Sequence, residues 1–188
     1  MVATEAEGRG RERDGEGARD RIAFDAVLFD LDGTLVDSRA DIAGTVNYCL
    51  AKLGRPAQPV ELLQTYVGDG VRALMERAFG TEDTAVIDAV LELWRPHYME
   101  HCLDSTRLYP GVAELLDGLR GVPLAVVSNK PERPSVRILE GLGLLARFGA
   151  VIGGDSAPTR KPDPGPLWMA LARLGPAGAG PGAGAGEA

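Results

Sequence analysis

The chain has 188 residues, of which 45% are apolar and 25% are charged, values typical of one globular domain with at most a modest insert. Its 27 acidic and 20 basic side chains give a formal charge of -7, which disfavours a nucleic-acid binder because such proteins normally carry a net basic patch. No apolar run approaches the ~20 residues of a membrane span, which excludes a spanning protein, and the charged first residues lack the hydrophobic segment of a secretory signal.

Both ends of the chain have compositions that predict no packed structure. Residues 5–21 interleave Glu, Asp, Arg and Gly, so they bury too little apolar surface to offset the entropy lost on ordering. Residues 176–188 are almost entirely Gly, Ala and Pro and offer no periodic apolar face. We expect disordered tails over residues 1–21 and 176–188.

Three short apolar segments predict buried parallel strands over residues 26–29, 123–127 and 150–152, because none alternates with polar residues. Apolar residues recur at helical spacing over residues 112–119 and 136–142, between these segments. Alternating strands and helices predict an α/β fold with a Rossmann-like parallel sheet and right-handed crossovers.

A long helical stretch interrupts this alternation between the first and second strands. Residues 40–105 carry the apolar spacing of about four helices, which is too much for a simple crossover connection. We therefore expect a small helical cap inserted over residues 40–105, and an α/β core made of residues 22–39 and 106–175.

The segment FDLDGTLVDS at residues 29–38 carries the most informative chemistry. It begins at the carboxyl end of a predicted buried strand, where open α/β sheets bind their ligands. Asp30 and Asp32 are separated by one residue, and Gly33 follows at the turn. An isolated Asp-Gly pair would indicate only a turn, but the preceding strand and the continuation of the segment favour a functional site.

Two later segments follow the second and third predicted strands. Ser128 and Asn129 come directly after residues 123–127, where Ser-Asn alone would indicate a helix cap or turn. Lys161 lies in the segment RKPDP, where a lone lysine before a helix would normally be solvated. Both segments gain weight from occurring in this order after residues 29–38.

Together the three segments resemble the first three motifs of the haloacid dehalogenase-like (HAD) hydrolase superfamily, most closely its phosphatases with a small helical cap, including phosphoglycolate phosphatases. The resemblance implies that Asp30 attacks phosphorus and becomes an aspartyl-phosphate. Asp32 would protonate the leaving oxygen and later activate water. It also implies Mg²⁺ as a cofactor, with Asp30 and Asp32 as metal ligands.

The same resemblance implies four phosphate-binding residues: Thr34, Ser128, Asn129 and Lys161. Thr34 would orient the second aspartate or hydrogen-bond the phosphoryl group, and Ser128 would donate a hydrogen bond to that group. Lys161 would stabilise negative charge on the nucleophile and the phosphoryl group.

The glycine-rich segment TYVGDGVR at residues 65–72 looks like the substrate-facing loop of such caps. Gly68 and Gly70 would present backbone amides at a helix N-terminus, and Arg72 would meet a substrate carboxylate. A plain helix–helix turn capped by Asp69 is the alternative interpretation.

Two other features favour structural roles. His97 and His101 are four residues apart beside Cys102, which superficially suggests zinc, but the sequence supplies no companion ligands, so we expect surface or core residues. Trp94 and Tyr98 share a helix face with His101, and we expect them to pack. With only two cysteines, the chain is no disulfide scaffold, and we expect a cytoplasmic protein.

The superfamily pattern continues with a fourth motif, a strand ending in Gly-Asp and a downstream Asp, which provides magnesium ligands. After Gly175 this chain enters its Gly/Ala/Pro-rich tail instead. The pair Gly154-Asp155 precedes Lys161, so we do not assign it to metal. We expect a truncated or frame-shifted chain whose first strand, residues 26–29, forms a sheet edge that invites self-association.

These features leave more than one function open. The favoured function is a magnesium-dependent phosphatase for a small phosphorylated metabolite, with 2-phosphoglycolate as the favoured substrate and no nucleic-acid or membrane partner. The alternatives are a weakly active or inactive remnant and a sugar-phosphate mutase-like relative. A dehalogenase is disfavoured because Asp32 supplies an acid–base group that dehalogenases generally lack.

Overall fold

The computed structural model describes residues 25–175, and the tails expected over residues 1–21 and 176–188 lie outside this range. Three parallel strands form one sheet in the order β1 (Val27–Phe29), β4 (Leu124–Val127) and β5 (Ala150–Ile152). The α/β fold and the parallel sheet are therefore confirmed. Within residues 25–175, β1 has a strand neighbour on one side only; the self-association expected through its other edge stays a prediction.

Helices cover both faces of the sheet, and the side chains of β4 alternate between them. Leu124 and Val126 join the cluster that includes buried residues of α5 (Val112–Gly118) and α6 (Glu132–Gly141). Ala125 and Val127 pack instead with Ala170 of α7 (Gly165–Leu174). All four residues of β4 are buried for this reason, and a short 3₁₀ helix, Leu145–Arg147, leads into β5.

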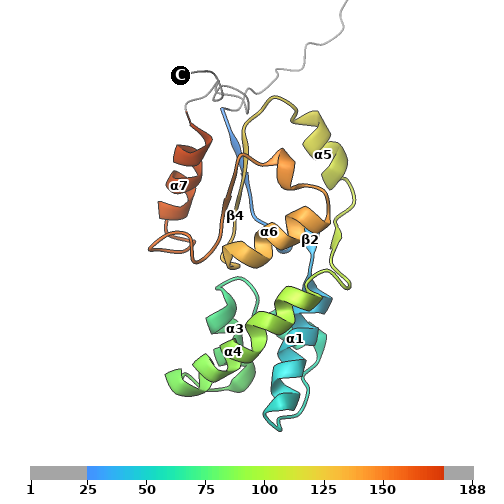
Figure 1. Ribbon diagram of the computed structural model, residues 1–188, viewed down its shortest axis with the longest axis vertical. Coiled ribbons are helices and arrows are strands. Elements are labelled where there is room, and N and C mark those ends of the chain that lie inside the picture. Colours follow the sequence, from blue (N-terminus) through green and yellow to red (C-terminus); the bar gives the residue numbers. More distant parts are fainter. Residues whose placement is uncertain (1–24, 176–188) are drawn as a thin grey trace, which may run out of the picture.

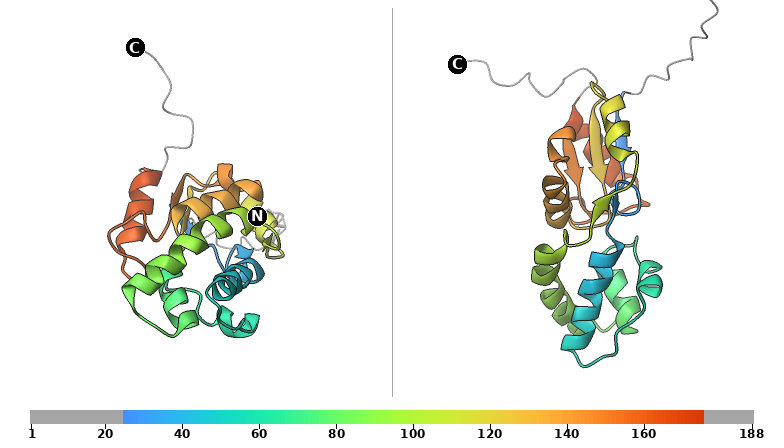
Figure 2. Two further views of the ribbon diagram at one scale, coloured as in Figure 1. Left: turned by 60° about the horizontal axis from the view of Figure 1, so that its bottom comes forward. Right: turned by 90° about the vertical axis from the view of Figure 1, so that its right-hand side faces the viewer.

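The four expected helices lie together at one end of the molecule, beyond the sheet (Figures 1 and 2). They are α1 (Arg39–Lys52), α2 (Val60–Gln64), α3 (Val71–Phe79) and α4 (Thr84–His101), and α1 packs against the other three. Asp83 caps the start of α4 by accepting hydrogen bonds from two backbone N–H groups. We refer to α1–α4 as the helical part of the molecule.

The chain passes between the sheet and the helical part twice, and the two connections lie side by side. Two short strands, β2 (Val36–Asp37) and β3 (Arg107–Leu108), pair antiparallel there. Next to them the buried carboxylate of Asp41 accepts hydrogen bonds from the backbone N–H groups of Ser105 and Thr106 at 2.8–3.1 Å, and from the Thr106 hydroxyl at 2.7 Å. These contacts tie the start of α1 to the connection that returns from α4.

One cluster of buried apolar side chains runs from the sheet into the helical part. Its members include Val126 and Ile138 beside the sheet, Leu31 after β1, and Ile42 and Met75 among the helices. The two parts of the molecule therefore share one hydrophobic core.

None of the helices within residues 25–175 combines the length and the apolar character needed to cross a membrane.

Candidate active site

The carboxyl ends of β1 and β4 carry expected catalytic and phosphate-binding residues. Asp30 directly follows β1, and Ser128 directly follows β4. One carboxylate oxygen of Asp30 lies 2.7 Å from the Nζ atom of Lys161, and the other accepts the backbone N–H of Leu31 at 2.7 Å. The Asp30 side chain stays 41% exposed, so its oxygens remain open to a substrate.

Asp32 lies deeper in the site, and both of its carboxylate oxygens have a side-chain partner. The hydroxyl of Ser38 donates to Oδ1 at 2.6 Å, and Lys130 Nζ lies 2.8 Å from Oδ2. Lys130 also donates a hydrogen bond to the hydroxyl of Tyr98 on α4 at 2.9 Å. The second aspartate is therefore held by the core and, through Lys130, by the helical part.

Lys130 carries a charge although its side chain is only 5% exposed. Burial by itself would lower the pKa of its ammonium group. The negative charge of Asp32 and the hydrogen bonds to Asp32 and Tyr98 outweigh burial and raise that pKa above its usual range. Burial also raises the pKa of the Tyr98 hydroxyl, to about 12, so this group is neutral at physiological pH.

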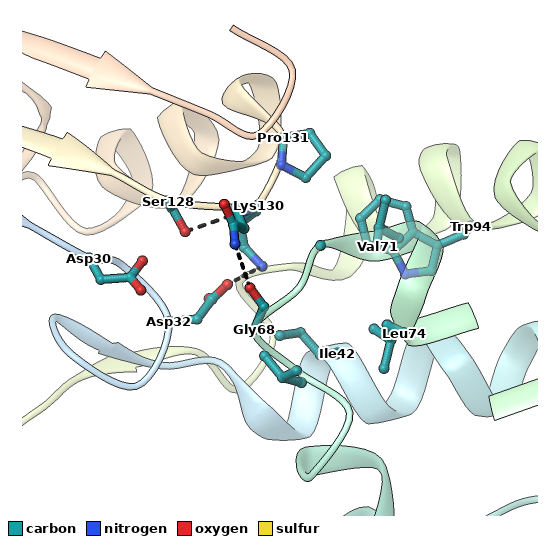
Figure 3. Close-up of a pocket in the computed structure, with 13 residues that line it drawn as sticks. Asp30, Asp32, Ile42, Gly68, Val71, Leu74, Trp94, Ser128, Lys130 and Pro131 are labelled. Carbon is teal, nitrogen blue, oxygen red and sulfur yellow. Dashed lines mark hydrogen bonds and ion pairs between the residues drawn. The ribbon is translucent and has the colours of Figure 1, made fainter. Parts of the chain in front are cut away.

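A cavity of about 120 Å³ opens between the sheet and the helical part, and Figure 3 shows the side chains that line it. At its polar end lie Asp30, Asp32, Ser128 and Lys130. Its other end is apolar, and the side chains that line it there are Ile42, Val67, Val71, Leu74 and Trp94. The site therefore places a charged reaction centre next to a small apolar chamber.

The glycine-rich loop meets the core at this cavity, and Gly68 and Gly70 both line it; the substrate contact expected from them stays a prediction. Gly70 has φ +93°, and a Cβ atom there would lie 3.3 Å from the carbonyl oxygen of Asn129. That backbone conformation is strained for any residue with a side chain. Only glycine fits this approach of the loop to the core without strain.

Asn129 plays a different part from the phosphate contact that was expected. Its amide nitrogen donates to the backbone oxygens of Gly68 at 2.8 Å and Lys161 at 3.1 Å. Its amide oxygen accepts the backbone N–H of Lys161 at 3.0 Å. Because the amide is occupied in this way, Asn129 joins the glycine-rich loop to the segment that carries Lys161.

Two other expected site residues lie away from the cavity. Thr34 is exposed and does not line it; the contact with the second aspartate that we expected from Thr34 is made by Ser38 instead. Arg72, expected to meet a substrate carboxylate, pairs with Asp88 on the exposed surface of the helical part. Its guanidinium is therefore engaged outside the site.

The remaining residues considered in the sequence occupy α4. His101 is partly exposed and bonds to Asp104 through Nδ1 at 2.8 Å, and the ring of His97 stacks on that of Tyr48. Trp94 stacks on Tyr98, with 4.6 Å between ring centroids, and its side chain also reaches the cavity (Figure 3). The Nε1 atom of Trp94 is buried without a hydrogen-bond partner within residues 25–175. Trp94 therefore packs, as expected, but it also forms part of the cavity wall.

Sequence reasoning missed three residues that hold the site: Ser38, Lys130 and Tyr98. Ser38 ends the segment of residues 29–38, Lys130 directly follows Asn129, and Tyr98 had been expected only to pack. Among residues 25–175 no group of three or more His, Cys, Asp or Glu side chains is placed to hold a metal ion.

Comparisons with known proteins agree with this geometry. Residues 24–182 match the family model of the haloacid dehalogenase-like hydrolases. A protein of Nitrosospira multiformis named phosphoglycolate phosphatase is 39% identical over 160 residues, which span 81% of this chain and 70% of the relative. A protein of the same name from Chromobacterium violaceum is 41% identical over 157 residues, 80% of this chain and 71% of the relative.

A solved structure shows the same arrangement. The crystal structure of a predicted phosphoglycolate phosphatase from Haemophilus somnus superimposes with a TM-score of 0.75 and 33% identity, and it covers 81% of this chain and 72% of that one. With the family match over residues 24–182, these findings lead to one conclusion: the chain belongs to the haloacid dehalogenase-like hydrolase family.

Proposed function

We propose that this protein is a magnesium-dependent phosphatase that hydrolyses a small phosphomonoester through a phosphorylated Asp30. The observation that carries the proposal is the position of the Asp30 carboxylate, which lies at the mouth of the cavity with Lys161 Nζ at 2.7 Å. A carboxylate nucleophile beside a fixed cation suits attack on an anionic phosphoryl group.

In the first step, an oxygen of Asp30 forms a bond to phosphorus while the bond from phosphorus to the ester oxygen breaks. The leaving oxygen takes a proton from Asp32, which acts as a general acid. In the second step, a water molecule gives a proton to Asp32 and attacks phosphorus. The bond between phosphorus and Asp30 then breaks, which releases inorganic phosphate and restores both aspartates.

The neighbouring side chains lower the electrostatic cost of bringing two anions together. Lys161 offsets negative charge on Asp30 and on the phosphoryl oxygens, and its ammonium group is already in position before the reaction begins. Ser128 lines the cavity. In its contact with the backbone N–H of Lys130, the Ser128 oxygen is the acceptor, so this contact does not use the hydroxyl proton. We assign Ser128 as the hydrogen-bond donor to the phosphoryl group.

The carboxylate of Asp30 fits a hard divalent cation, because Mg²⁺ prefers oxygen ligands and often binds through only one or two carboxylates together with substrate phosphate and water. The side chain of Asp32 fits less well, because its two oxygens are already held by Ser38 and by the charged Lys130. Asp30 is the better placed of the two, since its carboxylate is the more exposed. When bound, Mg²⁺ would neutralise charge on the phosphoryl oxygens.

The size of the cavity supports a small substrate, and we propose 2-phosphoglycolate. A cavity of about 120 Å³ is well below the ~300–1,000 Å³ of pockets for drug-sized ligands. The names of the curated relatives point to the same compound.

Replacement of the nucleophile tests the proposal. We expect Asp30→Asn to lower the release of phosphate from 2-phosphoglycolate and p-nitrophenyl phosphate by about three orders of magnitude or more, because the covalent route is lost. The matched control is Asp104→Asn, an acid-to-amide change on the exposed surface beside His101, which we expect to retain activity.

Both variants are assayed with Mg²⁺ and with a chelator, and acid-quenched wild-type protein is digested to find the phosphorylated peptide. The expected result is a phosphoryl group on Asp30 and activity that depends on Mg²⁺. Equal rates for wild type and Asp30→Asn would disprove the role of Asp30 as nucleophile.

A further inference from the structure

A buried chain of three side chains connects the helical part to the acid–base residue. Lys130 Nζ lies 2.8 Å from Asp32 Oδ2 and 2.9 Å from the hydroxyl oxygen of Tyr98. Asp32 follows β1, Lys130 follows β4, and Tyr98 belongs to α4. The chain therefore crosses from the core of the site to the helix that covers it.

Tyr98 is fixed in place on more than one side. It is fully buried, its ring stacks on Trp94 with 4.6 Å between centroids, and Lys130 Nζ lies 4.7 Å from its ring centroid. The ring therefore provides packing, whereas the hydroxyl provides one directed contact, which is the hydrogen bond from Lys130. Tyr98 is not among the residues that line the cavity, so a change at its hydroxyl does not touch the substrate directly.

The ion pair with Asp32 alone does not fix the orientation of the Lys130 side chain. A lysine ammonium is a compact charge on a flexible stem with three donors, and a single ion pair leaves its direction loosely defined. The second contact to Tyr98, which the packed ring holds still, fixes the ammonium between two partners. Asp32 in turn receives Lys130 on one oxygen and Ser38 on the other.

We propose that Tyr98 is a positioning residue for the acid–base step, which it supports by holding Lys130 against Asp32. This inference rests on the proposed phosphatase function, because it assigns Asp32 the proton transfer to the leaving oxygen. In that step the bond from Asp30 to phosphorus forms, the ester bond breaks, and the proton of Asp32 moves to the ester oxygen. A carboxyl that is poorly aimed would slow this transfer and leave substrate binding unchanged.

The dependence on the leaving group distinguishes this role from a purely structural one. An alkyl alcohol is a poor leaving group and needs the proton, whereas p-nitrophenolate leaves readily without it. General acid catalysis contributes ~10²–10⁴-fold where it is needed. Misalignment of the Asp32 carboxyl should therefore slow the hydrolysis of alkyl phosphates far more than that of p-nitrophenyl phosphate.

The test compares Tyr98→Phe with wild type and with Tyr48→Phe, a control that removes a hydroxyl from a partly buried tyrosine elsewhere in the helical part. We measure kcat/KM with 2-phosphoglycolate, glycerol 2-phosphate and p-nitrophenyl phosphate. We expect Tyr98→Phe to lose about tenfold or more with the two alkyl esters and less than about threefold with the aryl ester. Tyr48→Phe should resemble wild type with all three.

An equal loss with alkyl and aryl esters, or no loss with either, would overturn the proposal. If Tyr98→Phe does not fold, Lys130→Gln removes the same link from the other side and should show the same selective loss. If wild type hydrolyses none of the esters, the proposed function fails, and the link is then judged by NMR. Slow exchange of the Lys130 ammonium protons should be lost in Tyr98→Phe and kept in Tyr48→Phe; unchanged exchange in both would reject the link.

Discussion

At the level of single residues, the carboxylate of Asp32 is held by Ser38 at 2.6 Å and by Lys130 at 2.8 Å. The sequence motif had suggested Thr34 for part of this task, but Thr34 is exposed. A hydrogen bond to a charged group contributes ~1.5–3 kcal/mol, so removing the one from Ser38 should be enough to misalign the Asp32 carboxylate.

We therefore predict that Ser38→Ala lowers kcat/KM for 2-phosphoglycolate by about tenfold, which corresponds to ~1.4 kcal/mol of transition-state stabilisation. Thr34→Ala, which removes a hydroxyl of the same kind from the same segment, should change kcat/KM by less than about twofold. Steady-state kinetics of both variants decide the matter. A larger loss for Thr34→Ala than for Ser38→Ala would return the orienting role to Thr34.

The spacing within the first motif could predict Asp30 and Asp32 but not the partner of Asp32. The backbone N–H of Gly33 donates to the oxygen of Val36, so the chain turns back on itself directly after Asp32. This turn brings Ser38, six residues later, against the carboxylate. Such a contact depends on the path of the turn, which a local pattern of residue types does not define.

Among the elements, the two connections between the sheet and the helical part depend on one buried carboxylate. Asp41, in the first turn of α1, accepts hydrogen bonds from Ser105 and Thr106 in the returning connection. The sequence predicted the helix that carries Asp41 but not this contact, because its donors are more than sixty residues away. The short strands β2 and β3 were missed too, since two residues show no periodicity.

We predict that Asp41→Ala lowers the free energy of unfolding by about 3 kcal/mol, because it leaves buried N–H and hydroxyl donors without an acceptor. Asp83 is the matched control: it also accepts backbone N–H groups at a helix start, but it is exposed, so Asp83→Ala should cost only ~1 kcal/mol. Urea unfolding of both variants measures the difference. Equal costs would show that burial of Asp41 adds nothing to its contacts.

At the scale of the whole molecule, the site exists only where the sheet and the helical part meet. Asn129 donates to Gly68 across this boundary, and Tyr98 accepts from Lys130 across it. The strand positions could be predicted because apolar runs covered on both faces are conspicuous in a sequence. The joint between the two parts could not, because it is formed by single polar contacts distant in sequence and by a shared core.

This shared core predicts that the sheet and the helical part unfold together, although a helical insert of this kind could in principle unfold alone. Two adjacent leucines of α2 provide a matched pair, since Leu63 is fully buried in the common cluster and Leu62 is 41% exposed. We expect Leu63→Ala to cost 2–5 kcal/mol and Leu62→Ala less than about 0.5 kcal/mol.

Urea unfolding followed by fluorescence of the buried Trp94 reports on the helical part, in a Trp168→Phe background that removes the other tryptophan. Hydrogen exchange of the β4 amides in the same variants reports on the sheet. Because unfolding should be cooperative, Leu63→Ala should lower stability equally by both measurements; if β4 keeps wild-type protection while Trp94 unfolds early, the two parts are independent despite their common core.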